Sequence, residues 1–131
     1  MLIDTSGWLS SLDERDFRHE RATTLYASAK RRITHSYVIA ELVPLARKRG
    51  LSRKIILNFL SVLFDDPTIQ IIWVDDALTI RALKLLQVRM DKSWSLCDAA
   101  SFVIMKDRGI FESLTTDHHF EQAGFVQLLE S

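Results

Sequence analysis

The sequence has few of the residues that mark secreted, disordered or membrane-spanning chains. Of its 131 residues, one is cysteine (Cys97), two are proline and four are glycine. One cysteine excludes an internal disulfide and fits a reducing compartment, and so little proline and glycine argues against disorder or low complexity. No run approaches about 20 apolar residues, and no signal segment begins the chain. We therefore expect a cytoplasmic protein without membrane spans.

An excess of charge of either sign is also missing. Seventeen basic and seventeen acidic residues cancel, so the net charge does not indicate a nucleic-acid-binding protein. Two basic clusters, at Lys30–Arg32 and at Arg47–Arg49 with Arg53 and Lys54, lie at the C-termini of expected helices. Cations there complement the helix dipole, and phosphate binding is compatible with that interpretation. With 47% apolar residues, the chain has the composition and length of a single domain spanning residues 1–131.

Strand and helix patterns alternate along the chain. We expect strands at residues 2–4, 31–35, 69–74 and 113–116 and an edge strand at 125–129. Helices are expected at 8–12, 17–30, 37–49, 53–64, 76–90, 95–108 and 118–123, with Ser36 and Ser52 as N-caps. This alternation predicts an α/β fold with three α/β/α layers: a central, mainly parallel sheet of four to five strands and helices on both faces.

The helix expected at 53–64 is apolar on more than one face. A helix on the surface of a monomer needs only one apolar stripe. The apolar residues of this segment are Ile55, Ile56, Leu57, Phe59, Leu60, Val62, Leu63 and Phe64. We therefore expect a second subunit to cover part of it in a homodimer.

Four acids, Asp4, Glu41, Asp98 and Asp117, lie where strands end or helices begin. Taken singly, each has an ordinary structural explanation. Asp4 and Asp117 can be N-caps, Ser95 and Asp98 have the spacing of a capping box, and Glu41 can be a solvated helix residue. Taken together they point to a site, because the carboxyl ends of parallel strands meet at one edge of a sheet.

Carboxylates in such a cluster require compensation. Two of them about 4 Å apart repel by roughly 4 kcal/mol at an effective dielectric constant of about 20, so they need a cation or bound protons. Sites rich in oxygen ligands suit Mg²⁺ or Mn²⁺. We exclude Asp75 and Asp76 from the cluster because the strand before them is expected at an edge of the sheet. If the four acids bind a cation, 13 acidic residues remain against 17 basic ones, which leaves a mildly cationic surface.

The order of these motifs resembles that of the PIN-domain nucleases, in particular the small single-domain group that includes the toxins of bacterial VapBC toxin–antitoxin pairs. The resemblance covers nearly the whole chain. It is carried by four blocks in the family's order: Leu2-Ile3-Asp4-Thr5-Ser6, Ser36-Tyr37-Val38-Ile39-Ala40-Glu41-Leu42, Trp94-Ser95-Leu96-Cys97-Asp98-Ala99 and Leu114-Thr115-Thr116-Asp117-His118-His119-Phe120. It implies a sheet of order 3-2-1-4-5, with the strands before Asp4 and Asp117 side by side.

The resemblance also implies a function: hydrolysis of RNA phosphodiester bonds with one or two divalent ions. Asp4 and Asp98 are then expected as direct ligands, Glu41 as a ligand or as the residue that orients water, and Asp117 as acting through water or a second ion. Residues expected to orient these carboxylates are Thr5, Ser6, Ser95, Thr116 and, more remotely, Asp91. The implied partners are RNA and a cognate antitoxin protein.

Other interpretations stay open at this point. The chain can be an RNA-processing nuclease that is not a toxin, or a module that binds metal or RNA without turnover. Phosphotransfer through Asp4 is disfavoured, because Ser6 stands where a haloacid-dehalogenase-like phosphatase has its second aspartate. His118 and His119 lack a third ligand at zinc spacing. Cys97 has no evident base, so we interpret it as a packing residue.

Overall fold

A computed structural model describes residues 1–131. Its five strands form one sheet in which every neighbouring pair is parallel, in the order β3-β2-β1-β4-β5. The strands are short: β1 (Leu2–Ile3), β2 (Arg32–His35), β3 (Ile69–Ile72), β4 (Glu112–Leu114) and β5 (Val126–Gln127). The predicted parallel sheet is confirmed. The strand that precedes Asp75 and Asp76 lies at an edge, as expected.

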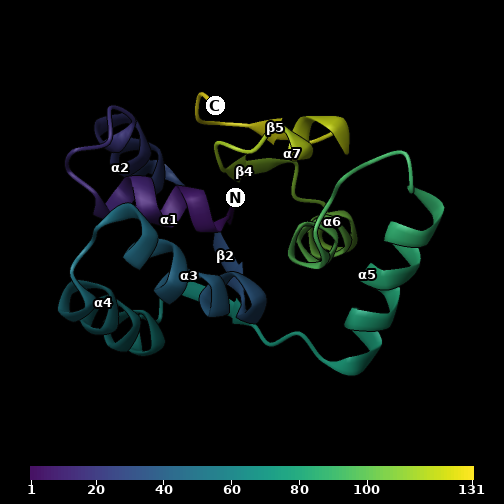
Figure 1. The fold of residues 1–131 in the computed structure, drawn as a ribbon, viewed down its shortest axis with the longest axis horizontal. Coiled ribbons are helices and arrows are strands. Elements are labelled where there is room, and N and C mark those ends of the chain that lie inside the picture. The colour runs from purple at the N-terminus through teal and green to yellow at the C-terminus, as the bar shows by residue number, and fades with distance from the viewer.

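Seven helices cover the two faces of this sheet. They are α1 (Thr5–Leu12), α2 (His19–Ser28), α3 (Ser36–Arg49), α4 (Arg53–Asp65), α5 (Asp76–Val88), α6 (Leu96–Arg108) and α7 (His119–Gln122). Figure 1 shows α1 to α4 gathered on one side, and α5 and α6 on the other. None of the seven combines the length and apolar character needed to cross a bilayer. The three-layer α/β/α prediction is therefore confirmed.

Strand β1 joins the two halves of the core. Its adjacent residues Leu2 and Ile3 are both fully buried, and they point to opposite faces of the sheet because side chains alternate along a strand. Ile3 packs with Val38 and Leu42 of α3, whereas Leu2 packs with Phe102 of α6. A central strand of two residues thus anchors a helical layer on each side.

The start of α3 differs from the expectation. Ser36 is the first residue of the helix and not its N-cap, which is His35, and no side chain caps this end. The Ser36 hydroxyl instead accepts a hydrogen bond at 2.9 Å from the backbone N–H of Val74, just beyond β3. A contact across the sheet therefore replaces the local cap that the sequence predicts.

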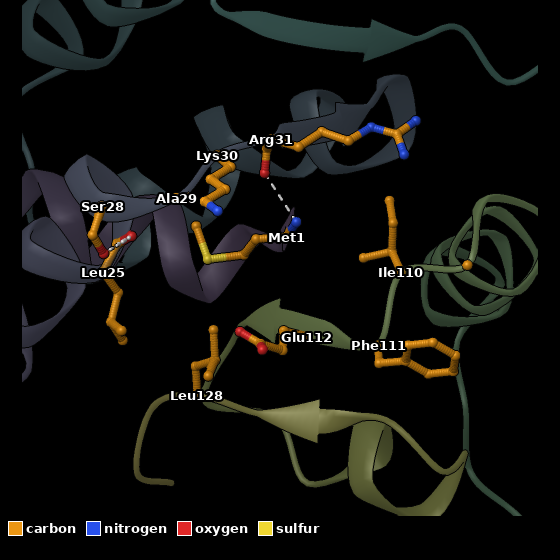
Figure 2. A pocket seen from close by; sticks show the side chains of 11 residues that line it. Met1, Leu25, Ser28, Ala29, Lys30, Arg31, Ile110, Phe111, Glu112 and Leu128 are labelled. Carbon is orange, nitrogen blue, oxygen red and sulfur yellow. Dashed lines mark hydrogen bonds between the residues drawn. The ribbon is translucent and has the colours of Figure 1, made fainter.

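A hollow of about 490 Å³ opens at the amino ends of the strands (Figure 2). Met1, Arg31 and Glu112, which precede or begin β1, β2 and β4, line it together with apolar side chains. The Met1 amino group donates a 2.9 Å hydrogen bond to the Arg31 carbonyl. This hollow mixes charges of both signs and contains none of the four candidate acids, so the site must lie at the other end of the sheet.

Candidate active site

Asp4 follows β1 at the carboxyl end of the central strand and is only 7% exposed. It occupies the N-cap position of α1, yet its side chain makes no capping hydrogen bond. Its Oδ2 instead accepts a hydrogen bond at 2.8 Å from the hydroxyl of Thr115 and a longer one, at 3.5 Å, from Ser6. The simple capping explanation for Asp4 is therefore wrong.

The surroundings of Asp4 make its ionised form costly. Burial raises the pKa of its carboxyl group to about 7, although hydrogen bonds from Thr115 and from the backbone of Thr5 act in the opposite direction. The negative charges of Asp98 and Asp117 also contribute to this raised pKa. A buried carboxylate beside two others calls for a bound cation or a proton.

Glu41 faces the same site from the second turn of α3. Its Oε2 accepts a 2.8 Å hydrogen bond from the Thr5 hydroxyl, and the residue is half-buried rather than fully solvated. Cys97 lies close to it: burial raises the pKa of the Cys97 thiol strongly, and the charges of Glu41, Asp4 and Asp98 add to this effect. Cys97 is thus a buried, protonated thiol, which agrees with its interpretation as a packing residue and not a nucleophile.

Asp98 lies in the first turn of α6 and forms the predicted capping box. The backbone N–H of Asp98 donates to the Ser95 hydroxyl at 3.0 Å, and the Ser95 N–H donates to Asp98 Oδ2 at 3.0 Å. The same Oδ2 lies 3.0 Å from Nδ1 of His119. The second carboxylate oxygen has no partner in these contacts. The cap therefore fixes the orientation of Asp98 and leaves it able to bind a ligand.

Asp117 follows β4, which is the neighbour of β1 in the sheet. Its backbone N–H donates to the Thr115 hydroxyl at 3.0 Å, and its Oδ1 accepts from the backbone N–H of His119 at 2.9 Å. His119 Nδ1 lies 3.3 Å from the same Oδ1. The His119 ring thus connects Asp117 with Asp98, and ligand atoms of Asp117, His118 and His119 lie within 4.8 Å of one another.

The four acids come from the ends of two neighbouring strands, the second turn of α3 and the first turn of α6. The charges of Asp98 and Asp117 act on Asp4, and those of Glu41, Asp4 and Asp98 act on the single thiol of Cys97. The structure therefore brings together the residues that the sequence singled out. All four offer carboxylate oxygens, the donors that Mg²⁺ and Mn²⁺ prefer, and the raised pKa of Asp4 shows a local need for positive charge.

Of the residues predicted to orient the carboxylates, some contact them and others do not. Thr5, Ser6 and Ser95 each donate a hydrogen bond to one of the carboxylates. Thr116 donates only its backbone N–H, to the hydroxyl of Ser6 at 3.0 Å. Asp91 is not brought to the site: its exposed carboxylate pairs with Arg89 at 3.1 Å and with Lys92 at 3.6 Å.

Sequence reasoning missed two residues of the site. Thr115, fully buried, connects Asp4 with the backbone of Asp117. Choosing its neighbour Thr116 was a one-residue error, and in an extended segment such an error selects the opposite face. His119 contacts two of the acids, whereas the sequence suggests it only as a zinc ligand. Its place two residues after Asp117 was the available signal, because an aspartate side chain often bonds the backbone two residues on.

Comparisons with known proteins find similarity over nearly the whole chain. The family model described as PIN domain matches residues 1–126. The chain is 27% identical over 129 residues to the 23S rRNA-specific endonuclease VapC20 of Mycobacterium tuberculosis, in strains CDC 1551 / Oshkosh and H37Rv, covering 98% of this chain and 97% of the relative. The crystal structure of that organism's VapC20, described as a Sarcin-Ricin loop cleaving toxin, superposes with a TM-score of 0.87 at 26% identity and 96% coverage of each chain.

Proposed function

This chain belongs to the PIN domain family, and from that premise we propose that it is a divalent-metal-dependent endoribonuclease that hydrolyses RNA phosphodiester bonds. The observation that carries the proposal is the cluster of acids around the buried carboxyl group of Asp4, whose pKa is raised to about 7. The other members of the cluster are Glu41, Asp98 and Asp117. Such a group favours a bound cation, and a cation beside carboxylates suits phosphate chemistry.

Each acid has a part in this proposal. Asp4 and Asp98 would hold Mg²⁺ or Mn²⁺, because hydrogen bonds from Thr115 and Ser95 fix their orientation. When bound, the ion supplies positive charge that stabilises the scissile phosphate as negative charge develops on it. Glu41, held by Thr5, is placed to orient the attacking water or to add a ligand. Asp117, the fourth acid, would act through water or a second ion.

We further propose that the chain is the toxin of a VapBC-like pair, neutralised by a cognate antitoxin protein. The support is the similarity over nearly the whole chain to a 23S rRNA-specific endonuclease and to a Sarcin-Ricin loop cleaving toxin. Ribosomal RNA is therefore the first substrate to test. A protein that cleaves ribosomal RNA would act in the cytoplasm, where ribosomes are found. Growth arrest on expression, relieved by the product of an adjacent reading frame, would support the toxin role. Cleavage of RNA without arrest would favour an RNA-processing nuclease.

Replacing Asp98 by asparagine tests the catalytic proposal. Asp98→Asn keeps the size of the side chain but removes the charge, and we expect more than about a 100-fold loss of RNA cleavage in Mn²⁺ or Mg²⁺. Asp91→Asn is the matched control, because Asp91 pairs with Arg89 outside the site, and it should cleave like wild type. EDTA should stop RNA cleavage by wild type and by Asp91→Asn. Equal cleavage by Asp98→Asn and wild type would overturn the role of Asp98.

Calorimetric titration with Mn²⁺ separates the enzyme from a module that does not turn over RNA. Wild type should bind the ion, and Asp98→Asn should bind it more weakly. If Mn²⁺ and RNA both bind but no cleavage occurs on any RNA tested, the chain is a binding module. If Mn²⁺ does not bind at all, the metal proposal fails.

A further inference from the structure

A second hollow, of about 440 Å³, lies between α5 and α6 and continues to the segment after α7. It is separate from the four carboxylates and contains none of them. Its volume falls within the range of pockets that take small organic ligands, roughly 300–1,000 Å³. We refer to it as the basic hollow, after the cations Arg81, Lys84, Arg89 and Lys106 that line it.

The floor of the basic hollow is aromatic. Trp94, Phe102 and Phe125 line it, and they pack on one another: the Trp94 and Phe102 rings meet edge to face at 5.0 Å, and Phe102 and Phe125 stack at 5.6 Å. The indole N–H of Trp94 donates a 2.9 Å hydrogen bond to Gln122. The rings are therefore held in place. Trp94 and Phe102 are only 7% and 3% exposed, and the Arg89 guanidinium lies 5.1 Å from the centre of the Trp94 ring, so the half-buried Phe125 is the ring most open to the hollow.

The rim of the basic hollow has more positive than negative charge. Two of its cations have acidic partners outside the lining: Arg81 pairs with Asp107 at 2.6 Å and Arg89 with Asp91 at 3.1 Å. Lys84 of α5 and Lys106 of α6 form no ion pair, although Lys106 helps to lower the pKa of Asp107. No acidic residue lines the hollow. Its chemistry thus fits an anion that also carries an apolar ring.

Short segments connect the basic hollow to the acidic site. Trp94 of its floor immediately precedes Ser95, whose backbone N–H holds Asp98. Gln122, which holds Trp94, is in α7 three residues after His119, and His119 contacts Asp98. Asp98 and Lys106 lie eight residues apart in α6, about 12 Å along the helix axis, a separation that a few nucleotide units can span.

We propose that the basic hollow binds a nucleotide of single-stranded RNA that flanks the cleaved phosphodiester bond, with its phosphates between Lys84 and Lys106 and its base against the ring of Phe125. Cations combined with aromatic rings are how proteins bind single-stranded nucleic acid without strict sequence preference. This inference rests on the proposed ribonuclease function for the identity of the ligand. An acidic peptide is the other class that such a surface attracts, and the experiment includes it.

The test compares two charge-matched double variants of the full chain, each also carrying Asp98→Asn so that RNA stays intact. Lys84→Ala/Lys106→Ala removes both unpaired cations of the hollow, and Lys30→Ala/Lys54→Ala removes two exposed lysines elsewhere. Anisotropy with a labelled 12-nucleotide RNA measures affinity at several salt concentrations. For the first variant we expect about tenfold weaker binding at low salt and a salt slope shallower by about 1.4, the value for two lost phosphate contacts at about 0.7 each. The control should bind like its parent.

A footprint on the unsubstituted lysines supplies an independent readout. RNA should shield Lys84 and Lys106 from an acetylating reagent and leave Lys30 and Lys54 reactive, whereas a polyglutamate peptide should shield none of them selectively. Equal RNA affinities for the two double variants, no RNA binding at all, or shielding by the peptide alone would overturn the proposal. If RNA binds through Lys84 and Lys106 but wild type cleaves nothing, the hydrolysis proposal fails and the basic hollow stands.

Discussion

The carboxyl group of Asp4 shows how strongly a single residue depends on its surroundings. Its neighbours in sequence, Ile3 and Thr5, are buried with it, so the charge has little access to water. The main donor within reach is Thr115, 111 positions away in the chain. An aspartate with an ordinary pKa near 3.9 thereby becomes one that holds its proton up to about pH 7 unless a cation replaces that proton.

Thr115→Val should weaken ion binding without disturbing the shape of the core. The substitution removes the hydroxyl that donates to Asp4 and accepts from Asp117, and a hydrogen bond to a charged group contributes about 1.5–3 kcal/mol. Because that bond lowers the pKa of Asp4, its loss raises this pKa further. We expect Mn²⁺ affinity at pH 7 to fall about tenfold or more, as measured by calorimetry, and to recover partly at pH 8.5.

Thr115→Ser is the matched control, because it keeps the hydroxyl and loses only a methyl group. It should bind Mn²⁺ nearly as wild type does. Equal affinities for the valine and serine variants would show that the hydroxyl does not support Asp4.

The burial of His35 makes the stability of the fold depend on pH in a way that does not involve the four acids of the candidate active site. The ring is fully buried; Nε2 lies 2.7 Å from the Ser101 hydroxyl, and Nδ1 has no partner. Burial lowers the pKa of His35 to about 4, against about 6.5 in the unfolded chain. The folded state therefore favours the neutral ring. Its contribution is complete above pH 6.5 and is lost as the pH falls towards 4, by roughly 3 kcal/mol at 1.36 kcal/mol per pKa unit.

Urea unfolding of wild type and His35→Phe at pH 7.5 and pH 4.5 measures this contribution. Wild type should lose more stability than the variant between the two pH values. The comparison with the variant is needed because the raised pKa of Asp4 acts in the opposite direction: its protonation stabilises the fold as the pH falls below about 7. The same loss in both proteins would contradict the assignment to His35.

Among the elements, α1 depends on one glycine. A Cβ atom at Gly7 would collide with the backbone carbonyl of Leu114 at the end of β4, so only glycine allows α1 to lie against that strand end. This close approach accompanies the 3.1 Å hydrogen bond from the Asp4 N–H to the Leu114 carbonyl. The positions of α1 and of Asp4 therefore both depend on contact with the Leu114 carbonyl.

Gly7→Ala should therefore destabilise the protein, although alanine is intrinsically the better helix former by roughly 0.8–1.0 kcal/mol. Forcing extra volume into a packed contact costs typically about 1–3 kcal/mol, which exceeds that gain. Urea unfolding should show a net loss of stability, and Mn²⁺ binding should weaken because Asp4 is displaced. A more stable variant would contradict the close-approach argument.

At the scale of the whole molecule, the exposed face of α4 supports the predicted homodimer. Only Ile56 and Leu63 of this helix are fully buried, whereas Leu57 and Phe64 are 42% and 49% exposed. The Phe64 ring stacks at 5.9 Å on Trp73, which is 63% exposed. Contiguous apolar surface of this kind marks interaction sites, and we propose that a second copy of the chain covers it.

Leu57→Asp/Phe64→Asp tests the dimer, because the two residues are seven positions apart and lie on one face of the helix. Light scattering coupled to size exclusion at about 10 µM should show a dimer for wild type and a monomer for the variant, since each lost burial costs about 1.5–3 kcal/mol. Phe17→Asp, at a 72% exposed position outside α4, is the control and should remain dimeric. A monomeric wild type would contradict the homodimer.

The sequence by itself determined the features that depend on local interactions. The capping box of Ser95 and Asp98, the N-cap at Ser52 and the end of α6 at residue 108 are predicted from the sequence and are present. Each links residues only a few positions apart, so its pattern can be read directly along the chain. The alternation of strands and helices also follows from local patterns, with element boundaries shifted by one or a few residues.

Only the tertiary structure decided which of these residues meet. The pairing of β1 with β4 brings Thr115 to Asp4, and the return of the chain after β4 brings His119 to Asp98. The same long-range packing leaves Asp91 outside the site and places the Ser36 hydroxyl against Val74. Register and burial are sums over contacts between distant segments, so neither the raised pKa of Asp4 nor the choice of Thr115 over Thr116 could be read from neighbouring residues alone.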